Sequence, residues 1–305
     1  MRTQTAAPDV RARWGDGHGR PVHTGRRWRP LVRAAGRWSV LGAFAVFTAL
    51  PFAWMLITAF KRNSDLYNPA HNPFWFNEPP TLEHLRYVFH NTMYAHWIAN
   101  TAMVGVAVVI LTLLLALPAG YSLSRFLGAW GGRLGISIFL VYLVPPTLLF
   151  IPLARVVSEL GLQNTVWALI VVYPTITVPF ATWLLMGFFK SIPRELEEQA
   201  LVDGYSRLGA FLRVTLPLAV PGIVAVMIFS FTISAQEFVY ALTFVTSTAR
   251  KTVSVGVPAD MVRGDIFDWG PLMASAFLAS VPVAVLYYFV LDKFVSGFTT
   301  AGAIR

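Results

Sequence analysis

Two short acidic segments stand out among the few places in this sequence that could do chemistry. Residues 190–204 read KSIPRELEEQALVDG and place carboxylates at positions 195, 197, 198 and 203. Residues 232–242 read TISAQEFVYAL and hold a single carboxylate, Glu237, in an apolar stretch. An acidic group well inside a bilayer costs about 2.5–3.5 kcal/mol, so such a group should face protein or water. Docking and solute contact fit these segments better than covalent catalysis.

The usual catalytic and metal-binding motifs are missing from the sequence. It contains no cysteine and no G-x-x-x-x-G-K-[ST], G-x-S-x-G or H-E-x-x-H pattern. Four of the six histidines, at positions 71, 84, 90 and 96, lie in or near residues 61–96, but their spacing does not repeat at i, i+4 as helical metal ligands do. We interpret this segment as a structured loop at a membrane interface, with a metal site as the alternative.

The composition indicates a membrane protein. Of 305 residues, 56% are hydrophobic and only 13% are charged, and the mean hydropathy is +0.59. A soluble fold of this length could not hide so much apolar surface, and a disordered chain would be far more polar. The net charge of +9 is expected to reflect orientation in the membrane and does not by itself indicate nucleic-acid binding.

Six apolar segments are long enough to cross a bilayer. We predict spans at about 38–60, 97–120, 134–154, 165–188, 216–245 and 271–291. Prolines inside these segments predict kinks, above all in the third and fourth spans. The fold class is therefore an all-α membrane protein with six transmembrane helices.

The distribution of lysine and arginine predicts that both chain ends are cytoplasmic. With the amino end inside, the inner segments carry 17 of these residues and the outer segments 7. Residues 1–37 contribute nine arginines, and we interpret them as a disordered basic tail that fixes topology and touches anionic lipid. Nucleic-acid binding by the tail has no motif behind it, and the long polar region argues against a cleaved signal peptide.

The acidic segment 190–204 predicts a short helix that projects from the membrane between spans four and five. Ser191 could cap this helix and Pro193 suits its first turn, while Gly204 can adopt the left-handed conformation that ends it. A second short helix is predicted over 206–214, with Ser206 as its cap. Two helices this short cannot fold alone, so we expect them to fit a groove on another protein.

Here the sequence resembles the permease subunits of binding-protein-dependent ABC importers. Their cytoplasmic loop carries E-A-A-x3-G-x9-I-x-L-P, and this chain reads Glu198-Gln199-Ala200, three residues, Gly204, nine residues, then Val214-Thr215-Leu216-Pro217. It departs from the pattern at Gln199 and Val214. The resemblance runs from about residue 38 and is strongest to the MalG-type half of carbohydrate importers, through LSRF at 123–126, FKSIPRELEEQA at 189–200 and KFVSGFTTAGA at 293–303.

The resemblance implies the type I importer permease fold, with residues 38–305 as the transmembrane domain and 190–217 as the coupling loop that docks on an ATPase. The implied coupling residues are Glu198, Gln199, Ala200, Asp203, Gly204, Leu208, Leu216 and Pro217. The implied partners are a second, MalF-like permease, two copies of a cytoplasmic ABC ATPase that binds ATP and Mg²⁺, and an extracytoplasmic sugar-binding protein. This chain would then be a transport subunit of the bacterial cytoplasmic membrane, with no ATPase site or cofactor of its own.

The second acidic segment replaces the family's W-N-E-F-x-x-A-L with AQEFVYAL at 235–242. Glu237 is a candidate for the substrate pathway or for a latch to the partner permease, and it could instead form a buried hydrogen bond with Gln236, Ser234 or Thr232. Aromatic rings stack on sugar faces, so Tyr240, Phe238 or Phe244 could contact a saccharide. The candidate pathway residues are Glu237, Gln236, Tyr240 and Phe238. Packing is the alternative for the aromatic ones.

Two other functions are compatible with a polytopic membrane protein. A secondary transporter would need intramembrane charges for ion coupling, commonly with internal repeats, and Glu237 is the one candidate that stands out. A membrane-bound enzyme would need catalytic groups clustered at one depth, and the sequence shows no such cluster. We therefore predict the importer permease.

Overall fold

The fold is described from a computed structural model. It describes the backbone of residues 28–303 and the side chains of residues 36–285, 287 and 288. The chain divides into two compact units, residues 1–51 and 52–305. The predicted basic tail lies outside the described residues up to position 27, and the next ten residues are helical, so the first helix begins earlier than the predicted position 38.

Helices make up most of the described chain. They are α1 (Trp28–Phe60), α2 (Asn63–Leu66), α3 (Glu83–Asn91), α4 (Tyr94–Arg125), α5 (Gly128–Tyr142), η2 (Pro146–Leu149), α6 (Phe150–Glu159), α7 (Val166–Val172), α8 (Pro174–Ser191), α9 (Arg194–Val202), α10 (Arg207–Ala210), η3 (Phe211–Thr215), α11 (Leu216–Leu218), α12 (Val220–Gln236), α13 (Val239–Phe244), η4 (Thr248–Arg250), α14 (Val253–Met261) and α15 (Trp269–Ala303). The strands β1 (Val262–Arg263) and β2 (Ile266–Phe267) form a two-stranded antiparallel hairpin.

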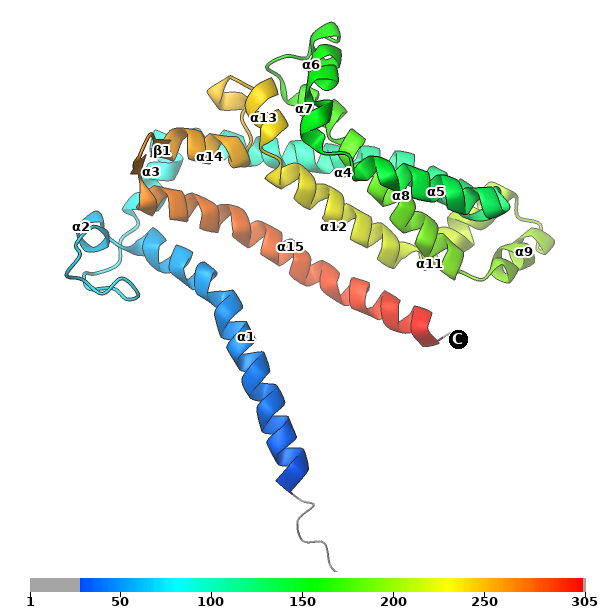
Figure 1. Cartoon of the computed structure of the whole chain (residues 1–305), viewed down its shortest axis with the longest axis horizontal. Coiled ribbons are helices and arrows are strands. Elements are labelled where there is room, and N and C mark those ends of the chain that lie inside the picture. Colours follow the sequence, from blue (N-terminus) through cyan, green and yellow to red (C-terminus); the bar gives the residue numbers. More distant parts are fainter. Residues whose placement is uncertain (1–27, 304–305) are drawn as a thin grey trace, which may run out of the picture. The chain divides into compact units, whose positions relative to one another are not determined.

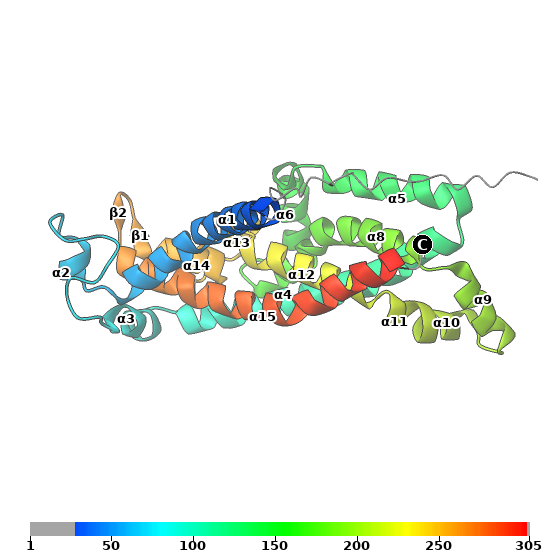
Figure 2. The ribbon, with the colours of Figure 1, turned by 90° about the horizontal axis from the view of Figure 1, so that it is seen from below.

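The second unit is built around α4, which packs along α8 and α12 (Figures 1 and 2). Helix α5 lies against α8 and α4, while α15 runs beside α12 and contacts α3 and α14. One buried apolar cluster joins α4 to α7 and α13, and another joins α4 to α8 and α12. Most other large apolar side chains of the spans are exposed, as expected for helices whose outer faces meet lipid or a partner subunit.

Close contact between α4 and α8 depends on one small residue and one polar pair. A Cβ built on Gly120 would lie 3.1 Å from the backbone nitrogen of Met186 and 3.2 Å from the carbonyl oxygen of Thr182. About two turns before Gly120 on α4, the hydroxyl of Thr112 hydrogen-bonds that of Thr177 on α8 at 2.6 Å. Small residues and hydroxyl pairs of this kind hold helices together where water is absent.

The spans are less regular than the sequence predicted. Gly36–Phe60, Tyr94–Arg125 and Val166–Ser191 are long and apolar enough to cross a membrane as they stand. Two further candidates are bent pairs: Gly128–Tyr142 with Pro146–Glu159 turns by 83°, and Arg207–Leu218 with Val220–Gln236 turns by 74°. The bend near the proline pair of the span 134–154 confirms the predicted kink there. The predicted span 216–245 is wrong in detail, because the chain bends between Leu218 and Val220 and the helix ends at Gln236, before Glu237.

The loop that follows α1 is ordered by a buried carboxylate, as the prediction of a structured segment required. Asp65 accepts hydrogen bonds from the backbone and side-chain nitrogens of Asn77, at 3.0 and 2.8 Å, and lies 2.9 Å from His71 Nδ1. Burial alone would raise the pKa of Asp65, but the hydrogen bonds from Asn77, His71 and Glu78 outweigh it and hold that pKa below its ordinary value. Of the other loop histidines, His84 is buried and its Nε2 lies 2.8 Å from the carbonyl oxygen of Lys61.

Candidate functional site: the loop between α8 and α12

Helix α9 is a short helix closed at its carboxyl end by a glycine. Gly204 has φ +89°, its N–H donates to the carbonyl of Leu201 at 3.1 Å, and the next N–H, of Tyr205, donates to that of Ala200 at 3.0 Å. These two bonds form a Schellman motif, which requires a left-handed residue at this position. The predicted helix end at Gly204 is confirmed.

The start of α9 differs from the prediction. Ser191 is the last residue of α8, and its hydroxyl donates back to the carbonyl of Phe188 at 2.7 Å instead of capping the next helix. Pro193 lies at the N-cap with ψ 135°, one position before the first turn. The chain therefore leaves α8 through one extended residue, Ile192, and turns at once into α9.

The second short helix begins at the predicted cap and continues past its predicted end at position 214 as three consecutive helical pieces. Ser206 Oγ accepts the N–H of Gly209 at 3.1 Å, and α10 extends over four residues. The chain continues as the π-helical turn η3 and then α11. Because a proline follows in each of the next two helices, at positions 217 and 221, the backbone bends sharply before α12 enters the bundle.

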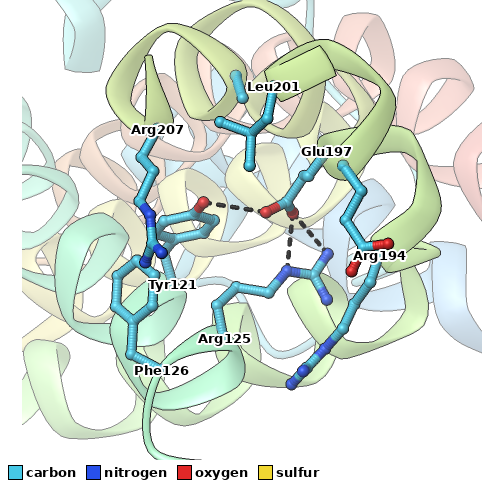
Figure 3. A pocket seen from close by; sticks show the side chains of 9 residues that line it. Tyr121, Arg125, Phe126, Arg194, Glu197, Leu201 and Arg207 are labelled. Carbon is cyan, nitrogen blue, oxygen red and sulfur yellow. Dashed lines mark hydrogen bonds and ion pairs between the residues drawn. The ribbon is translucent and has the colours of Figure 1, made fainter. Parts of the chain in front are cut away.

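An ion pair that joins two distant parts of the chain holds α9 in place (Figure 3). The Nε of Arg125, at the end of α4, donates to Oε1 of Glu197 at 2.7 Å, and its Nη2 forms an ion-pair contact with the same oxygen at 2.7 Å. The hydroxyl of Tyr121, one turn earlier on α4, donates to Oε2 at 3.0 Å. Arg125 also donates to the carbonyl of Ile192 at 3.0 Å. Both charged side chains are nearly buried, so the pair fixes α9 against the end of α4.

Two further arginines surround this pair. Arg194 donates to the carbonyl of Ser124 at 3.2 Å, and the guanidinium of Arg207 lies over the ring of Phe126, 5.7 Å from its centroid. Together with the pair they line a cavity of about 150 Å³ between α9, α10 and the end of α4. The end of α4 and both loop helices thus form one interlocked body.

The outer surface of this body is apolar at its tip and acidic beside it. Val202 is 88% exposed, and Leu201, Tyr205, Leu208 and Leu212 are exposed as well. A shallow hollow of about 300 Å³ beside the tip is lined by Glu195, Glu198, Gln199, Val202 and Asp203. Among the predicted coupling residues, Glu198, Gln199, Asp203, Gly204, Leu208 and Pro217 are exposed, Leu216 is half-buried and Ala200 is buried.

Glu237 lies at the break between α12 and α13 and caps α13. Its carboxylate accepts the backbone N–H of Tyr240 at 3.0 Å and of Ala241 at 3.1 Å, and the hydroxyl of Tyr173 at 2.9 Å. The predicted partners are wrong. Within the described chain, the hydroxyls of Ser234 and Thr232 instead bond back to carbonyls one turn earlier on α12.

The other candidate pathway residues divide into buried and exposed ones. Tyr240 is fully buried, its ring stacks with those of Phe150 and Phe244, and its hydroxyl donates to the carbonyl of Pro146. Gln236 and Phe238 are exposed on either side of Glu237. In this conformation Tyr240 packs within the core, while Gln236 and Phe238 are free to meet a solute or a partner.

Comparison with known proteins decides the family. The family described as "Binding-protein-dependent transport system inner membrane component" matches residues 113–300, more than half of the chain. The chain belongs to this family. The match covers α4 from its middle, the whole loop between α8 and α12, and most of α15.

Individual permease proteins resemble the chain over most of its length. It is 33% identical to the sulfoquinovosyl glycerol transport system permease protein SmoH of Agrobacterium fabrum, over 83% of this chain and 87% of that protein. It is 31% identical to the diacetylchitobiose uptake system permease protein DasC of Streptomyces coelicolor, over 88% of this chain and 96% of that protein. A bacterial ABC transporter that imports the acidic polysaccharide alginate has a chain with the same fold, with a TM-score of 0.71 at 18% identity, covering 90% of this chain and 99% of that one.

Membership confirms the predicted family, and the structure adds residues that the sequence prediction missed. Arg125, Tyr121 and Arg194 were not named as site residues, and Glu197 was noted only as one of the carboxylates of the acidic segment. Arg125 lies in the LSRF segment at 123–126, where a charge at the end of an apolar span has to find a partner. The partner could not be identified because 72 residues separate it from Arg125 in the sequence.

Proposed function

We propose that this chain is the permease subunit of an ATP-driven importer, and that the loop 191–217 couples it to a separate ATPase. The observation that carries the proposal is the exposed tip around Val202, held on a body that the Arg125–Glu197 pair locks to α4. A rigid projection with an apolar tip is suited to a groove on another protein. Its acidic flank calls for basic groups at the rim of that groove.

In the proposed assembly, other subunits bind the nucleotide, complete the pathway and deliver the solute. Two copies of a cytoplasmic ABC ATPase would bind ATP and Mg²⁺, a second MalF-like permease would complete the pathway, and an extracytoplasmic binding protein would deliver the solute. Within it, residues 38–305 form a transmembrane domain of six spans in the bacterial cytoplasmic membrane, with both chain ends inside. The count of six takes each bent helix pair as one span and adds α15, whose described apolar stretch is Trp269–Val285.

The mechanism that fits this geometry is alternating access. When ATP closes the ATPase subunits, the docked loops are drawn together. Because α9 is fixed to the end of α4, movement of the loop moves that helix and the α8 that packs along it. ATP biases the equilibrium only to the extent that it binds the closed state more tightly than the open one. No covalent step takes place in this chain.

The proposed cargo is a sugar, and an oligosaccharide or glycoside in particular. This proposal is supported by the names of similar permeases. They belong to transport systems for sulfoquinovosyl glycerol, diacetylchitobiose and, in Thermococcus litoralis, trehalose and maltose. Gln236, Phe238 and Glu237 at the α12–α13 break are the pathway residues proposed for contact with it.

Replacement of Gly204 tests the coupling role. At φ +89° a β-branched residue is strained, so Gly204→Val should open the Schellman motif and turn the loop away from the ATPase. We expect ATP hydrolysis to continue in the assembled transporter in proteoliposomes while ATP-dependent sugar uptake falls at least tenfold. Gly204→Asn is the matched control, because asparagine tolerates this conformation, and it should retain most of the uptake. Normal uptake by the valine variant would refute the coupling role.

A further inference from the structure

A second cavity, separate from the coupling loop, lies where the loop after α1 meets the start of α15. It has a volume of about 350 Å³ and is lined by Trp54, Thr58, Lys61, Leu66, Tyr67, Pro73 and Trp269. All of these residues belong to the second unit of the chain. Three of the seven are aromatic residues with a polar atom on the ring, a composition suited to a ligand with both apolar and polar surface.

The aromatic walls are fixed by contacts outside the cavity. Tyr67 donates its hydroxyl to the carbonyl of Phe267 at 3.2 Å and accepts the N–H of Trp269 at 3.3 Å. The ring of Trp269 stacks on that of Phe267, with centroids 5.1 Å apart, and Trp54 meets Phe74 edge to face at 5.4 Å. A ligand would therefore find these rings already in place, with little conformational entropy left to lose.

Two polar groups at the cavity have hydrogen-bonding capacity to spare. Thr58 is 2% exposed, and its hydroxyl has no hydrogen-bond partner among the residues that the structure describes, although a helical threonine commonly bonds to the preceding turn. The ammonium of Lys61 donates to the carbonyl of Asn72 at 2.7 Å and lies 3.6 Å from the Asp65 carboxylate, which leaves one of its three protons unassigned. A buried hydroxyl without a partner is costly unless a ligand satisfies it.

The charge at the cavity argues against a phosphate or an alkyl chain as its occupant. Lys61 is neutralised by the buried Asp65 carboxylate, so a lipid phosphate would find no unpaired positive charge. An alkyl chain would leave the Thr58 hydroxyl unsatisfied. A pyranose ring has apolar C–H faces for the aromatic rings and hydroxyls for the two polar groups.

We propose that this cavity is a saccharide subsite that holds one pyranose ring, separate from the pathway residues around Glu237. The choice of a sugar rests on the proposed function. The subsite would hold the sugar beside the loop that follows α1, before or after its passage between the helices.

The test measures sugar binding to the full chain in lipid nanodiscs by saturation-transfer difference NMR. Maltose, trehalose and N,N′-diacetylchitobiose are the probes. We expect transfer to at least one of them, binding about tenfold weaker in Trp269→Ala, and about fivefold weaker in Thr58→Val, which keeps the side-chain shape but removes the hydroxyl. Trp75→Ala is the matched control, since Trp75 is an exposed tryptophan of the same loop that does not line the cavity, and its binding should equal that of the unchanged chain.

Three outcomes would overturn the subsite: no transfer to any of the three sugars, equal binding in the Trp269 and Trp75 variants, or transfer to lipid alkyl protons alone. Sugar uptake by the assembled transporter, measured in parallel, separates this proposal from the proposed function. Binding that depends on Trp269 supports the subsite even if no sugar is taken up. ATP-dependent uptake without such binding refutes the subsite and leaves the importer function standing.

Discussion

Two arginine–glutamate ion pairs in this chain differ in how far they are exposed to solvent. Arg125 and Glu197 are nearly buried, whereas Arg155 and Glu159 form their 2.8 Å contact at 82% and 63% exposure. An exposed pair contributes at most about 1 kcal/mol, because water screens it, but removal of one partner from a buried pair costs about 3–5 kcal/mol. The first pair should therefore govern the position of α9, and the second should have little structural effect.

Glu197→Gln should release α9 from α4. We expect the change to cost about 3 kcal/mol locally, at the low end because the pair is not fully buried, and to speed hydrogen exchange of the α9 amides about a hundredfold. Hydrogen exchange followed by mass spectrometry measures this directly. Glu159→Gln makes the same chemical change at the exposed pair and should leave exchange within a factor of about five. Equal effects of the two variants would show that the buried pair does not hold the helix.

Asp65 gives the loop after α1 a defined response to acid. Its pKa is lowered in the folded chain, so its contribution to stability is present above the ordinary value of 3.8 and is lost as the pH falls through the lower folded value. Hydrogen exchange in residues 61–78 should thus be insensitive to this group between pH 7 and pH 5 and should rise only in stronger acid. Asp65→Asn should abolish that acid step, whereas Asp265→Asn, at an exposed position, should keep it. An acid step that persists in the Asp65 variant would assign it to another group.

At the scale of the elements, the contact between α4 and α8 is limited by the size of one residue. Gly120→Val should push the two helices apart and destabilise the chain in detergent by about 1–3 kcal/mol, because its Cβ would already crowd the α8 backbone. Gly187→Val is the control, since a Cβ there meets nothing within 4 Å. Thermal unfolding of the two purified variants compares them. Similar midpoints would mean that the helices can separate without cost.

The helices could be predicted well from the sequence where local patterns decide them. Apolar runs placed the main helices, and Gly204 and Ser206 marked helix ends because their roles depend on neighbours within a few residues. The break at Glu237 was missed because the segment remains apolar on both sides, and the carboxylate that caps α13 resembles a buried acid in sequence. Ser191 was misassigned because its hydroxyl could serve either the helix before it or the helix after it.

At the scale of the whole molecule, the site could be predicted only in part. The exposed residues of the coupling loop could be predicted from a sequence pattern within that one loop. Their predicted role in docking on an ATPase came from the resemblance to importer permeases. The Arg125–Glu197–Tyr121 network and the cavity at Trp269 could not be predicted, since each joins segments far apart in the chain. Only the packing of α4 against the loop, and of α15 beside the loop after α1, brings those residues together.

The orientation of the molecule can be tested because the chain has no cysteine of its own. Val202 is 88% and Ile266 is 70% exposed, so a single cysteine at either position should accept a label. We expect a membrane-impermeant maleimide to label Val202→Cys only in inverted vesicles and Ile266→Cys only in intact cells. Binding of the proposed ATPase should protect the first cysteine and not the second. Labelling of both from the same side would contradict the six-span arrangement.

The Schellman closure of α9 and the ion pair beneath it have a consequence for the order of assembly. The two Schellman hydrogen bonds and the ion pair lie within this chain, so we expect the projection to form before the proposed ATPase arrives. Association then resembles the docking of two rigid bodies. The loop does not have to fold on contact, so little of the binding free energy is lost to ordering it. We therefore expect ATPase subunits to detach and rebind without unfolding the loop, and one permease to accept successive ATPase copies during its lifetime.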